Sequence, residues 1–394
     1  MKTLIVGAGP VGLAAALALK HRGVNDDITV LEASAQNAVS FGDRNIALSS
    51  ASWRFLSRLG VTISAAERAP IREVEITQRG AFGLLRLDAR DVAAPELGAA
   101  TPYPALKAAL DNATKAAGIE IVYGANVASV QHVAQHAEVH LMSGEQMRAD
   151  CVVLADGAGS DLVREFKRIE RDSGQTAVIT RVSASKPRRG VAFERFTGGG
   201  ALALIPRADH DPTKGMHDPK GMHDPKGMPQ WTVVWARPRV DAERMLQLDA
   251  ATLGGEINAA FGNTMGELTL TAKLTSYPLI WRFVEPRASG AIVALGNAAQ
   301  GLHPVAAQGL NLGLADARQF ADAMEKTANG IAATLASFAR QRGVDRVARI
   351  GFTGLLAYGF DRGGWLFDVP RGLGLTAVQM LPPLRRELVR RLAL

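Results

Sequence analysis

A glycine-rich turn directly behind a short apolar run constrains this chain more than any other feature. Leu4-Ile5-Val6 runs into Gly7-Ala8-Gly9-Pro10-Val11-Gly12, and the alanine-rich stretch from Leu13 to Lys20 follows. In a strand–turn–helix unit, one glycine permits the tight turn, one lets the backbone approach a pyrophosphate, and one lets helix and strand pack closely. The phosphates would lie on unpaired N–H groups at the helix N-terminus. The pattern predicts a dinucleotide site, and a turn that binds no ligand is the alternative.

An acidic residue supports the dinucleotide interpretation. A second apolar run, Ile28-Thr29-Val30-Leu31, ends in Glu32 and Ala33. Glu32 stands at about the spacing from the glycines at which an acid receives the ribose hydroxyls of the adenosine. A carboxylate there suits an unphosphorylated ribose, so it favours FAD or NAD and disfavours a 2′-phosphate.

Composition narrows the class of protein. The 394 residues are 47% hydrophobic and 21% charged, which is typical of a soluble globular protein of one large domain or a few coupled ones. Cys151 is the single cysteine, so no intrachain disulfide can form, and its apolar surroundings predict an inert core thiol. We expect neither a signal peptide nor a membrane-spanning helix, and hence a reducing cytoplasmic location.

The net charge of +7 raises the question of an anionic partner. No basic stripe interleaved with aromatic residues is present, so we expect no nucleic-acid binding. Part of the excess lies between Leu384 and Leu392, where apolar residues and arginines alternate at helical spacing. This pattern predicts a terminal helix docked on the body with solvated arginines. The alternative is a helix that contacts a membrane surface, peripheral to the inner membrane, or a partner protein.

A short motif, His-Asp-Pro-x-Lys-Gly-Met or its shorter form, is written three times between His210 and Met228. Proline and glycine in each copy predict a disordered-type loop over 209–229 with no core of its own. The segments Ala201 to Pro206 and Gln230 to Trp235 flank it and read as strands, so the repeat enlarges a hairpin. The His-Asp pairs admit a metal site, but a flexible tract rarely preorganises one, and we predict no metal.

Two further strand-to-loop transitions contain glycine. The apolar run from Cys151 to Ala155 leads into Asp156-Gly157-Ala158-Gly159-Ser160, after which we expect a helix that carries Arg164. The run from Ala291 to Leu295 leads into Gly296-Asn297 and, past Pro304, into a helix that opens at Gln308-Gly309-Leu310-Asn311. Three such loops at one sheet edge would present themselves to one extended ligand.

With these motifs in order, the chain resembles the FAD-dependent aromatic hydroxylases, the class A flavin monooxygenases with the p-hydroxybenzoate hydroxylase fold. Four further segments are similar to the ubiquinone-biosynthesis hydroxylases, above all to the branch that acts on 2-octaprenyl-6-methoxyphenol. These segments are 43–49, 174–177, 194–197 and 297–304. The resemblance covers nearly the whole chain except the repeat.

The resemblance implies an α/β fold with a Rossmann-like FAD-binding domain of the glutathione-reductase type. That domain would be discontinuous, built from residues 1–70, 101–170 and 285–345. A β-sheet substrate domain, residues 71–100 and 171–284, would be interleaved with it, and residues 346–394 would form a C-terminal helical region. The apolar stretch from Phe352 to Leu381 is a candidate wall for a polyprenyl tail, with ordinary core packing as the alternative.

Site residues follow from the same resemblance. It assigns catalytic roles to Arg44, Pro304 and Gln308, although Arg44 could equally be a surface arginine. Asp156 could equally cap the helix expected after it. The residues implied in cofactor binding are Gly7, Gly9, Pro10, Val11, Gly12, Glu32, Ala33, Arg44, Val127, Asp156, Gly157, Gly296, Asn297, Pro304, Gln308, Gly309, Leu310 and Asn311.

Two positions depart from the family pattern. Many members carry Asp at the position of Asn297 and Gly at the position of Ala307. Asparagine can still hydrogen-bond a ribityl hydroxyl but brings no charge, and it agrees with the methoxyphenol branch. The methyl group of Ala307 would narrow the approach to the flavin or require a shifted loop.

The activity implied is hydroxylation of a prenylated phenol through a flavin C4a-hydroperoxide, with FAD as cofactor, O2 as co-substrate and NAD(P)H as reductant. The expected partners are a hydrophobic phenolic substrate and a protein complex of ubiquinone biosynthesis. Two alternatives remain. One is a flavin oxidase or reductase acting on another aromatic or isoprenoid compound, and the other is an FAD-holding structural member of a lipid-biosynthetic complex.

Overall fold

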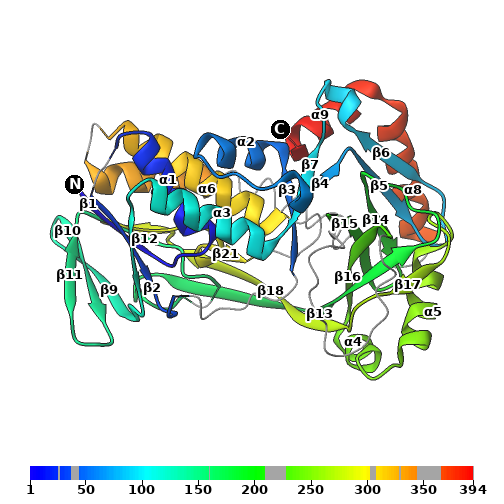
Figure 1. Cartoon of the computed structure of the whole chain (residues 1–394), viewed down its shortest axis with the longest axis horizontal. Helices are drawn as coiled ribbons and strands as arrows, with labels where there is room; N and C mark the ends of the chain where they lie inside the picture. Colours follow the sequence, from blue (N-terminus) through cyan, green and yellow to red (C-terminus); the bar gives the residue numbers. More distant parts are fainter. Residues whose placement is uncertain are drawn as a thin grey trace.

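Two large sheets lie toward opposite ends of the molecule, and two long strands, β13 (Lys167–Ala184) and β18 (Thr275–Glu285), run between them (Figure 1). The structure is a computed structural model. It describes residues 1–24, 27–36, 44–158, 160–208, 228–301, 308–327, 330–343 and 365–393.

The sheet that contains the glycine-rich turn is mostly parallel, in the order β19-β20-β12-β1-β2-β8. Its strands are β1 (Lys2–Val6), β2 (Asp27–Glu32), β8 (Glu120–Tyr123), β12 (Cys151–Leu154), β19 (Ala288–Ser289) and β20 (Ile292–Ala294). Strand β1 is buried on both faces, with Ile5 in one hydrophobic cluster and Leu4 and Val6 in another. This two-sided burial explains the unbroken apolar run in the sequence. Because β1, β12 and β20 are parallel neighbours, their carboxyl ends meet at one edge, as predicted.

Helices cover one face of this sheet and a small antiparallel sheet covers the other (Figure 1). The helices are α1 (Pro10–His21), α3 (Tyr103–Ala116), α6 (Gln308–Glu325) and a helix over 331–343. The small sheet contains β9 (Val127–Val133), β10 (His136–Leu141) and β11 (Gln146–Ala149). Helix α1 contacts both α3 and α6, which explains why it is apolar almost all round.

The second large sheet is mixed, in the order β21-β18-β13-β16-β15-β14-β5-β6, and β17 pairs with β13. Its other strands are β5 (Glu73–Gln78), β6 (Leu84–Asp88), β14 (Val191–Thr197), β15 (Gly200–Pro206), β16 (Gln230–Pro238), β17 (Leu268–Leu270) and β21 (Gln300–Gly301). Helices α4 (Arg239–Met245) and α5 (Ala250–Phe261) bury one face of it. The opposite face is turned toward the first sheet.

The remaining elements bridge and flank these layers. Strands β3 (Asn45–Ser49), β7 (Gly98–Pro102) and β4 (Ala69–Ile71) form a small sheet next to helix α2 (Ser50–Arg58). Short 3-10 turns are η1 (Ala65–Glu67), η2 (Ala89–Val92) and η3 (Gly296–Ala298). The C-terminal helices α8 (Trp365–Met380) and α9 (Pro382–Ala393) lie beside β5 and β6 at the upper right of Figure 1. In the described part of the chain, no helix combines the length and the hydropathy that crossing a bilayer requires.

Most predicted elements are confirmed, including the α/β class, the C-terminal helices and the hairpin that flanks the repeat, where Pro206 pairs with Trp231. Residues 209–227 of the repeat lie outside the described residues. Cys151 is fully buried, as predicted, and burial raises the pKa of its thiol to about 12. Where the domain boundaries fall stays a prediction.

One local prediction is wrong. The helix expected after Ser160 is absent, because residues 160–166 contain no helix and β13 begins at Lys167. The Leu162 carbonyl accepts a hydrogen bond from the Val130 N–H of β9 (2.8 Å), and Val163 is buried under the small sheet. Packing on β9 to β11 therefore replaces the local helical pattern.

Candidate functional site

A cavity of about 1890 Å³ lies between the two large sheets. Pockets for drug-sized ligands occupy roughly 300–1,000 Å³, so this cavity has room for a dinucleotide and a second molecule. Its wall runs from the turn at Gly7 to Val11, past the start of α6, to the open face of the mixed sheet. One continuous space therefore joins the predicted cofactor site to the predicted substrate domain.

The three glycines of the first turn differ in what a side chain would meet. Gly7 has a φ of +104°, and a Cβ atom there would lie 2.6 Å from the Ala155 carbonyl oxygen. A Cβ atom at Gly12 would overlap the Gly7 carbonyl oxygen. At Gly9, in contrast, a Cβ atom would meet no protein atom within 4 Å, and Gly9 lines the cavity. Gly7 and Gly12 serve packing, whereas the space in front of Gly9 fits a pyrophosphate held close to the backbone.

Glu32 lies at the end of β2, beside this turn. Its carboxylate accepts hydrogen bonds from the Ala8 N–H (2.8 Å) and the Ser34 N–H (3.0 Å), and it lines the cavity. Both backbone contacts fix the carboxylate where an adenosine ribose would lie against the glycine turn. Helix α3 adds Tyr103, Lys107 and Asp111 to the wall, which the sequence did not single out. Burial raises the pKa of Tyr103 to about 12, so its hydroxyl stays a hydrogen-bond donor.

The buried carboxylate of Asp316 holds the turn after β20 in place. The Gly296 N–H donates to Asp316 Oδ2 of α6 (3.1 Å). The Arg287 guanidinium also contacts Asp316, and Arg342 Nε donates to its Oδ1 (2.7 Å). The side chains of Asp316, Arg342 and Arg287 are 0%, 2% and 4% exposed. This buried cluster positions the turn so that Asn297 lines the cavity.

Gly296 and Gly313 both pack against Val11. A Cβ atom at Gly296 would approach Val11 Cγ2 to 3.0 Å, and one at Gly313 to 2.5 Å. The first and third glycine-bearing loops therefore touch each other through Val11. This contact explains why glycine occupies both positions.

The start of α6 contributes Gly309, Leu310 and Asn311 to the cavity wall. The Asn311 side chain is directed to the scaffold: its Oδ1 accepts from the Ser49 N–H (2.9 Å) and Ser52 Oγ (2.8 Å), and its Nδ2 donates to the Ala47 carbonyl (3.0 Å). Asn311 therefore holds β3 and α2 against α6. The first backbone N–H groups of a helix lack intrahelical acceptors, so they are available to a ligand in the cavity.

Asp156 and Arg44 also line the cavity. Burial raises the pKa of Asp156, although a hydrogen bond with Ser160 and the charge of Arg168 act in the opposite direction. Since no helix follows Asp156, the helix-cap alternative for this residue is wrong. Arg44 is exposed, and its guanidinium lies 5.2 Å from the centre of the Tyr277 ring.

Some of the predicted site residues do not line the cavity. Gly12, Ala33, Val127 and Gly296 are outside its wall, Val127 because it begins β9 in the small antiparallel sheet. Pro304 and Ala307 lie outside the described residues, as does the side chain of Gln308, the residue at which α6 begins. The predicted residues that do line the cavity are Gly7, Gly9, Pro10, Val11, Glu32, Arg44, Asp156, Gly157, Asn297, Gly309, Leu310 and Asn311.

The floor of the cavity on the mixed sheet consists of side chains that share one face. Strand register places Glu194, Ala203, Val234 and Ile179 in one row across β14, β15, β16 and β13. The next row contains Ala192, Ile205, Thr232 and Arg181. All eight line the cavity. The period-2 pattern of these strands could have identified the floor, but only once their pairing was known.

Comparison with known proteins agrees with this geometry. A family model described as an FAD binding domain matches residues 1–343. The ubiquinone hydroxylase UbiL of Rhodospirillum rubrum is 26% identical, over 98% of this chain and 88% of the relative. The 3-demethoxyubiquinol 3-hydroxylase of Escherichia coli is 27% identical, over 81% of this chain and 78% of the relative.

Solved structures show the same fold. PqsL, described as a probable FAD-dependent monooxygenase from Pseudomonas aeruginosa, has a TM-score of 0.75 at 18% identity, covering 96% of this chain and 99% of that one. The p-nitrophenol 4-monooxygenase PnpA of Pseudomonas putida has a TM-score of 0.72 at 18% identity, covering 99% and 98%.

Proposed function

The chain belongs to the FAD-binding domain family, and we propose that it is an FAD-dependent monooxygenase that hydroxylates a prenylated phenol in ubiquinone biosynthesis. The observation that carries this proposal is the cavity that joins the glycine-turn end to the largely aliphatic floor of the mixed sheet. Similarity to ubiquinone hydroxylases over most of the chain supports the substrate class. The 6-methoxyphenol precursor is the first substrate to test.

The residues divide into two groups. Gly9, Glu32, Asp156 and Asn297 hold the FAD, which supplies redox chemistry with O2 when bound, and NAD(P)H is the reductant. The backbone N–H groups at the start of α6 stabilise negative charge on the reduced ring. The family resemblance gives catalytic roles to Arg44, Pro304 and Gln308, and of these Arg44 lies on the cavity wall.

Most of the floor is aliphatic. Ile179, Ala192, Ala203, Ile205 and Val234 present aliphatic side chains to the cavity, and the polar side chains of Glu194, Thr232 and Arg181 lie among them. The aliphatic part accepts an aromatic ring and limits the access of water to a reactive oxygen species, and the polar groups can hydrogen-bond a ring hydroxyl.

Expression of the chain in a ubiquinone-deficient hydroxylase mutant tests the function. We expect ubiquinone to return and the accumulated 6-methoxyphenol precursor to disappear in extracts analysed by mass spectrometry. Unchanged accumulation in cells that contain folded, yellow protein would contradict this substrate. A flavin oxidase or reductase would incorporate no oxygen atom from O2 into its product. A structural FAD protein would restore ubiquinone even as a variant that has lost turnover.

We further propose that the C-terminal helices contact the inner-membrane surface, with a ubiquinone-biosynthesis complex as a partner. Helix α9 packs on the body of the protein through the buried Val389, as the sequence predicts. Its arginines Arg386, Arg390 and Arg391 are exposed. Next to it, α8 exposes apolar side chains at helical spacing: Val369, Leu373 and Met380, which are 43%, 58% and 75% exposed. An apolar face beside cationic residues suits an anionic bilayer.

Vesicle sedimentation measures this contact. The purified protein is expected to bind vesicles that contain anionic lipid, and the double variant Leu373→Glu/Met380→Glu to bind at least about tenfold more weakly. Val240→Glu is the matched control, because Val240 is 77% exposed on the distant helix α4. Equal binding by the double variant and the control would refute the contact.

A further inference from the structure

The cavity has an arm that extends beyond the floor of the mixed sheet, between β5–β6 and the C-terminal helices. Ile76, Leu85, Leu87, Leu375, Val378 and Val389 line this arm. Each of these side chains is aliphatic, and Leu85, Leu87, Leu375 and Val389 are at most 8% exposed. An apolar cavity of this kind binds water poorly and hydrocarbon well.

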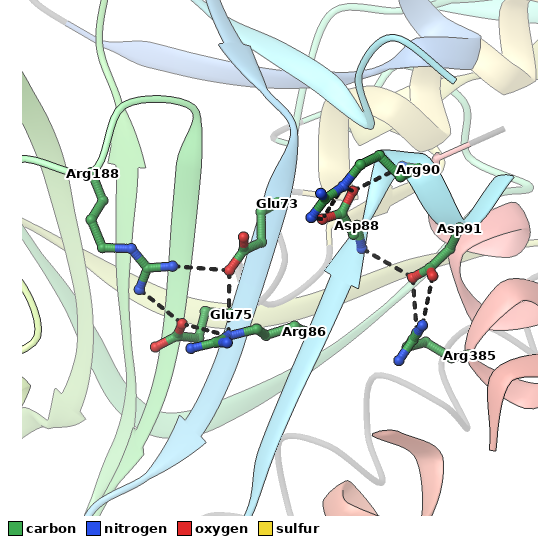
Figure 2. A network of polar contacts seen from close by, with 8 residues as sticks. All are labelled: Glu73, Glu75, Arg86, Asp88, Arg90, Asp91, Arg188 and Arg385. Carbon is green, nitrogen blue, oxygen red and sulfur yellow. Dashed lines mark hydrogen bonds and ion pairs between the residues drawn. The ribbon is translucent and has the colours of Figure 1, made fainter. Parts of the chain in front are cut away.

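The register of β5 and β6 explains why the arm is apolar. Ile76 pairs with Leu85 and Val74 with Leu87, and these four side chains share the face toward the arm. The alternate residues Glu73, Glu75 and Arg86 lie on the opposite face. There Arg188 donates to Glu75 (2.9 Å) and to Glu73 (3.0 Å), as Figure 2 shows. The charges are thus held behind the wall and leave the arm itself aliphatic.

The helical side of the arm is held in place by polar contacts outside it. Arg385 of α9 donates to both oxygens of Asp91, at 2.9 and 2.7 Å (Figure 2). The Arg86 N–H donates to Gln379 Oε1 of α8 (2.8 Å). Both helices are therefore fixed to β6 and η2 by hydrogen bonds, and the arm is a built site.

The arm reaches the surface at α8. Pro370 and Gly374 are exposed to solvent and also line the cavity, and Arg371 and Arg391 border the same region. This opening lies on α8, the helix that exposes Leu373 and Met380. A chain longer than the arm can therefore leave the protein through an apolar surface.

We propose that this arm binds the isoprenoid tail of the substrate, with the phenol ring held on the floor of the mixed sheet and the distal tail leaving along the side of α8 that carries Pro370 and Gly374. This inference rests on the proposed function, because it takes the substrate to be a tailed phenol. It adds the binding site for the tail and names its walls. Affinity for the substrate then depends on tail length as well as on the ring.

Calorimetric titration of the oxidised FAD-loaded protein with phenols that carry zero, one, two and four isoprene units tests this site without turnover. We expect the dissociation constant to fall on the order of tenfold for each of the first units. The heat-capacity change on binding should become more negative as the tail lengthens. Affinity independent of tail length would overturn the proposal.

Gly374→Phe places a side chain in the opening. A Cβ atom at Gly374 meets no atom within 4 Å, so the protein accommodates the substitution. We expect at least tenfold weaker binding of the four-unit phenol and unchanged binding of the phenol without a tail. Gly255→Phe on α5 is the matched control, because Gly255 is likewise unobstructed and lies outside the cavity wall.

The outcomes separate the two proposals. Equal weakening for both phenols in Gly374→Phe would overturn the tail site. Tail-dependent binding without any hydroxylated product would contradict the proposed function and leave the tail site supported.

Discussion

A Gly9→Val variant is expected to bind FAD about a hundredfold more weakly or worse, while its apoprotein unfolds at the temperature of the unaltered apoprotein. Gly9 has a φ of −70° and a ψ of 172°, an extended conformation that a β-branched residue adopts readily. Its Cβ atom would meet no protein atom, so the fold tolerates the side chain. The isopropyl group would instead occupy the space in front of the turn, where the pyrophosphate lies.

Gly12→Val separates this effect from a general loss of structure. Its Cβ atom would overlap the Gly7 carbonyl, so we expect this variant to lose both FAD and thermal stability. Flavin fluorescence titration gives the affinities, and circular dichroism melting of the apoproteins gives the stabilities. FAD affinity in Gly9→Val equal to that of the unaltered protein would show that the pyrophosphate does not lie on this turn.

Asp316→Asn is expected to lower the free energy of unfolding by about 3–5 kcal/mol. Asp316 is fully buried between the guanidinium groups of Arg287 and Arg342, and its Oδ2 also accepts from the Gly296 N–H. An amide in this position removes the negative charge that both buried guanidinium groups contact and places a donor against donors. The Gly296 turn should loosen as well, so FAD affinity should fall.

Urea denaturation of the FAD-free protein measures this loss. The matched control is Asp322→Asn on the same helix, since Asp322 is 37% exposed and pairs with Arg22 at the surface. That pair should contribute less than about 1 kcal/mol. A loss in Asp316→Asn no larger than in the control would mean that the buried cluster does not stabilise the turn.

The parallel sheet and its three loops could be predicted because their causes are local. The short apolar run Leu4-Ile5-Val6 is followed by a turn that requires glycine. The strands that end at Leu154 and Ala294 are likewise apolar and are followed by glycine-containing turns. Strands of this type, buried on both faces, leave an unbroken apolar pattern. Gly9, Glu32, Asp156 and Asn297 come together on one wall because the four strands β2, β1, β12 and β20 are parallel neighbours.

The residues that the sequence did not identify depend on long-range pairing. Asp316 stands in an ordinary helical pattern, and only the fold brings Arg287 and Arg342 to it. The sequence singled out the stretch from Phe352 to Leu381 as a candidate wall for the tail, but the opposite wall of the arm depends on the register of β5 with β6 and on the docking of α8. The helix wrongly expected after Ser160 is a related case, because the Leu162 carbonyl bonds to β9 rather than within a local helix.

Oxygen-isotope labelling tests the central claim most directly. FAD-loaded protein is supplied with NADH or NADPH, a phenol that carries a short isoprenoid tail, and ¹⁸O2, and the product is examined by mass spectrometry. The account predicts a hydroxylated phenol that contains one ¹⁸O atom, with its formation dependent on bound FAD. Oxidised product without ¹⁸O, or reductant consumption that yields only hydrogen peroxide for every tailed phenol tested, would contradict it.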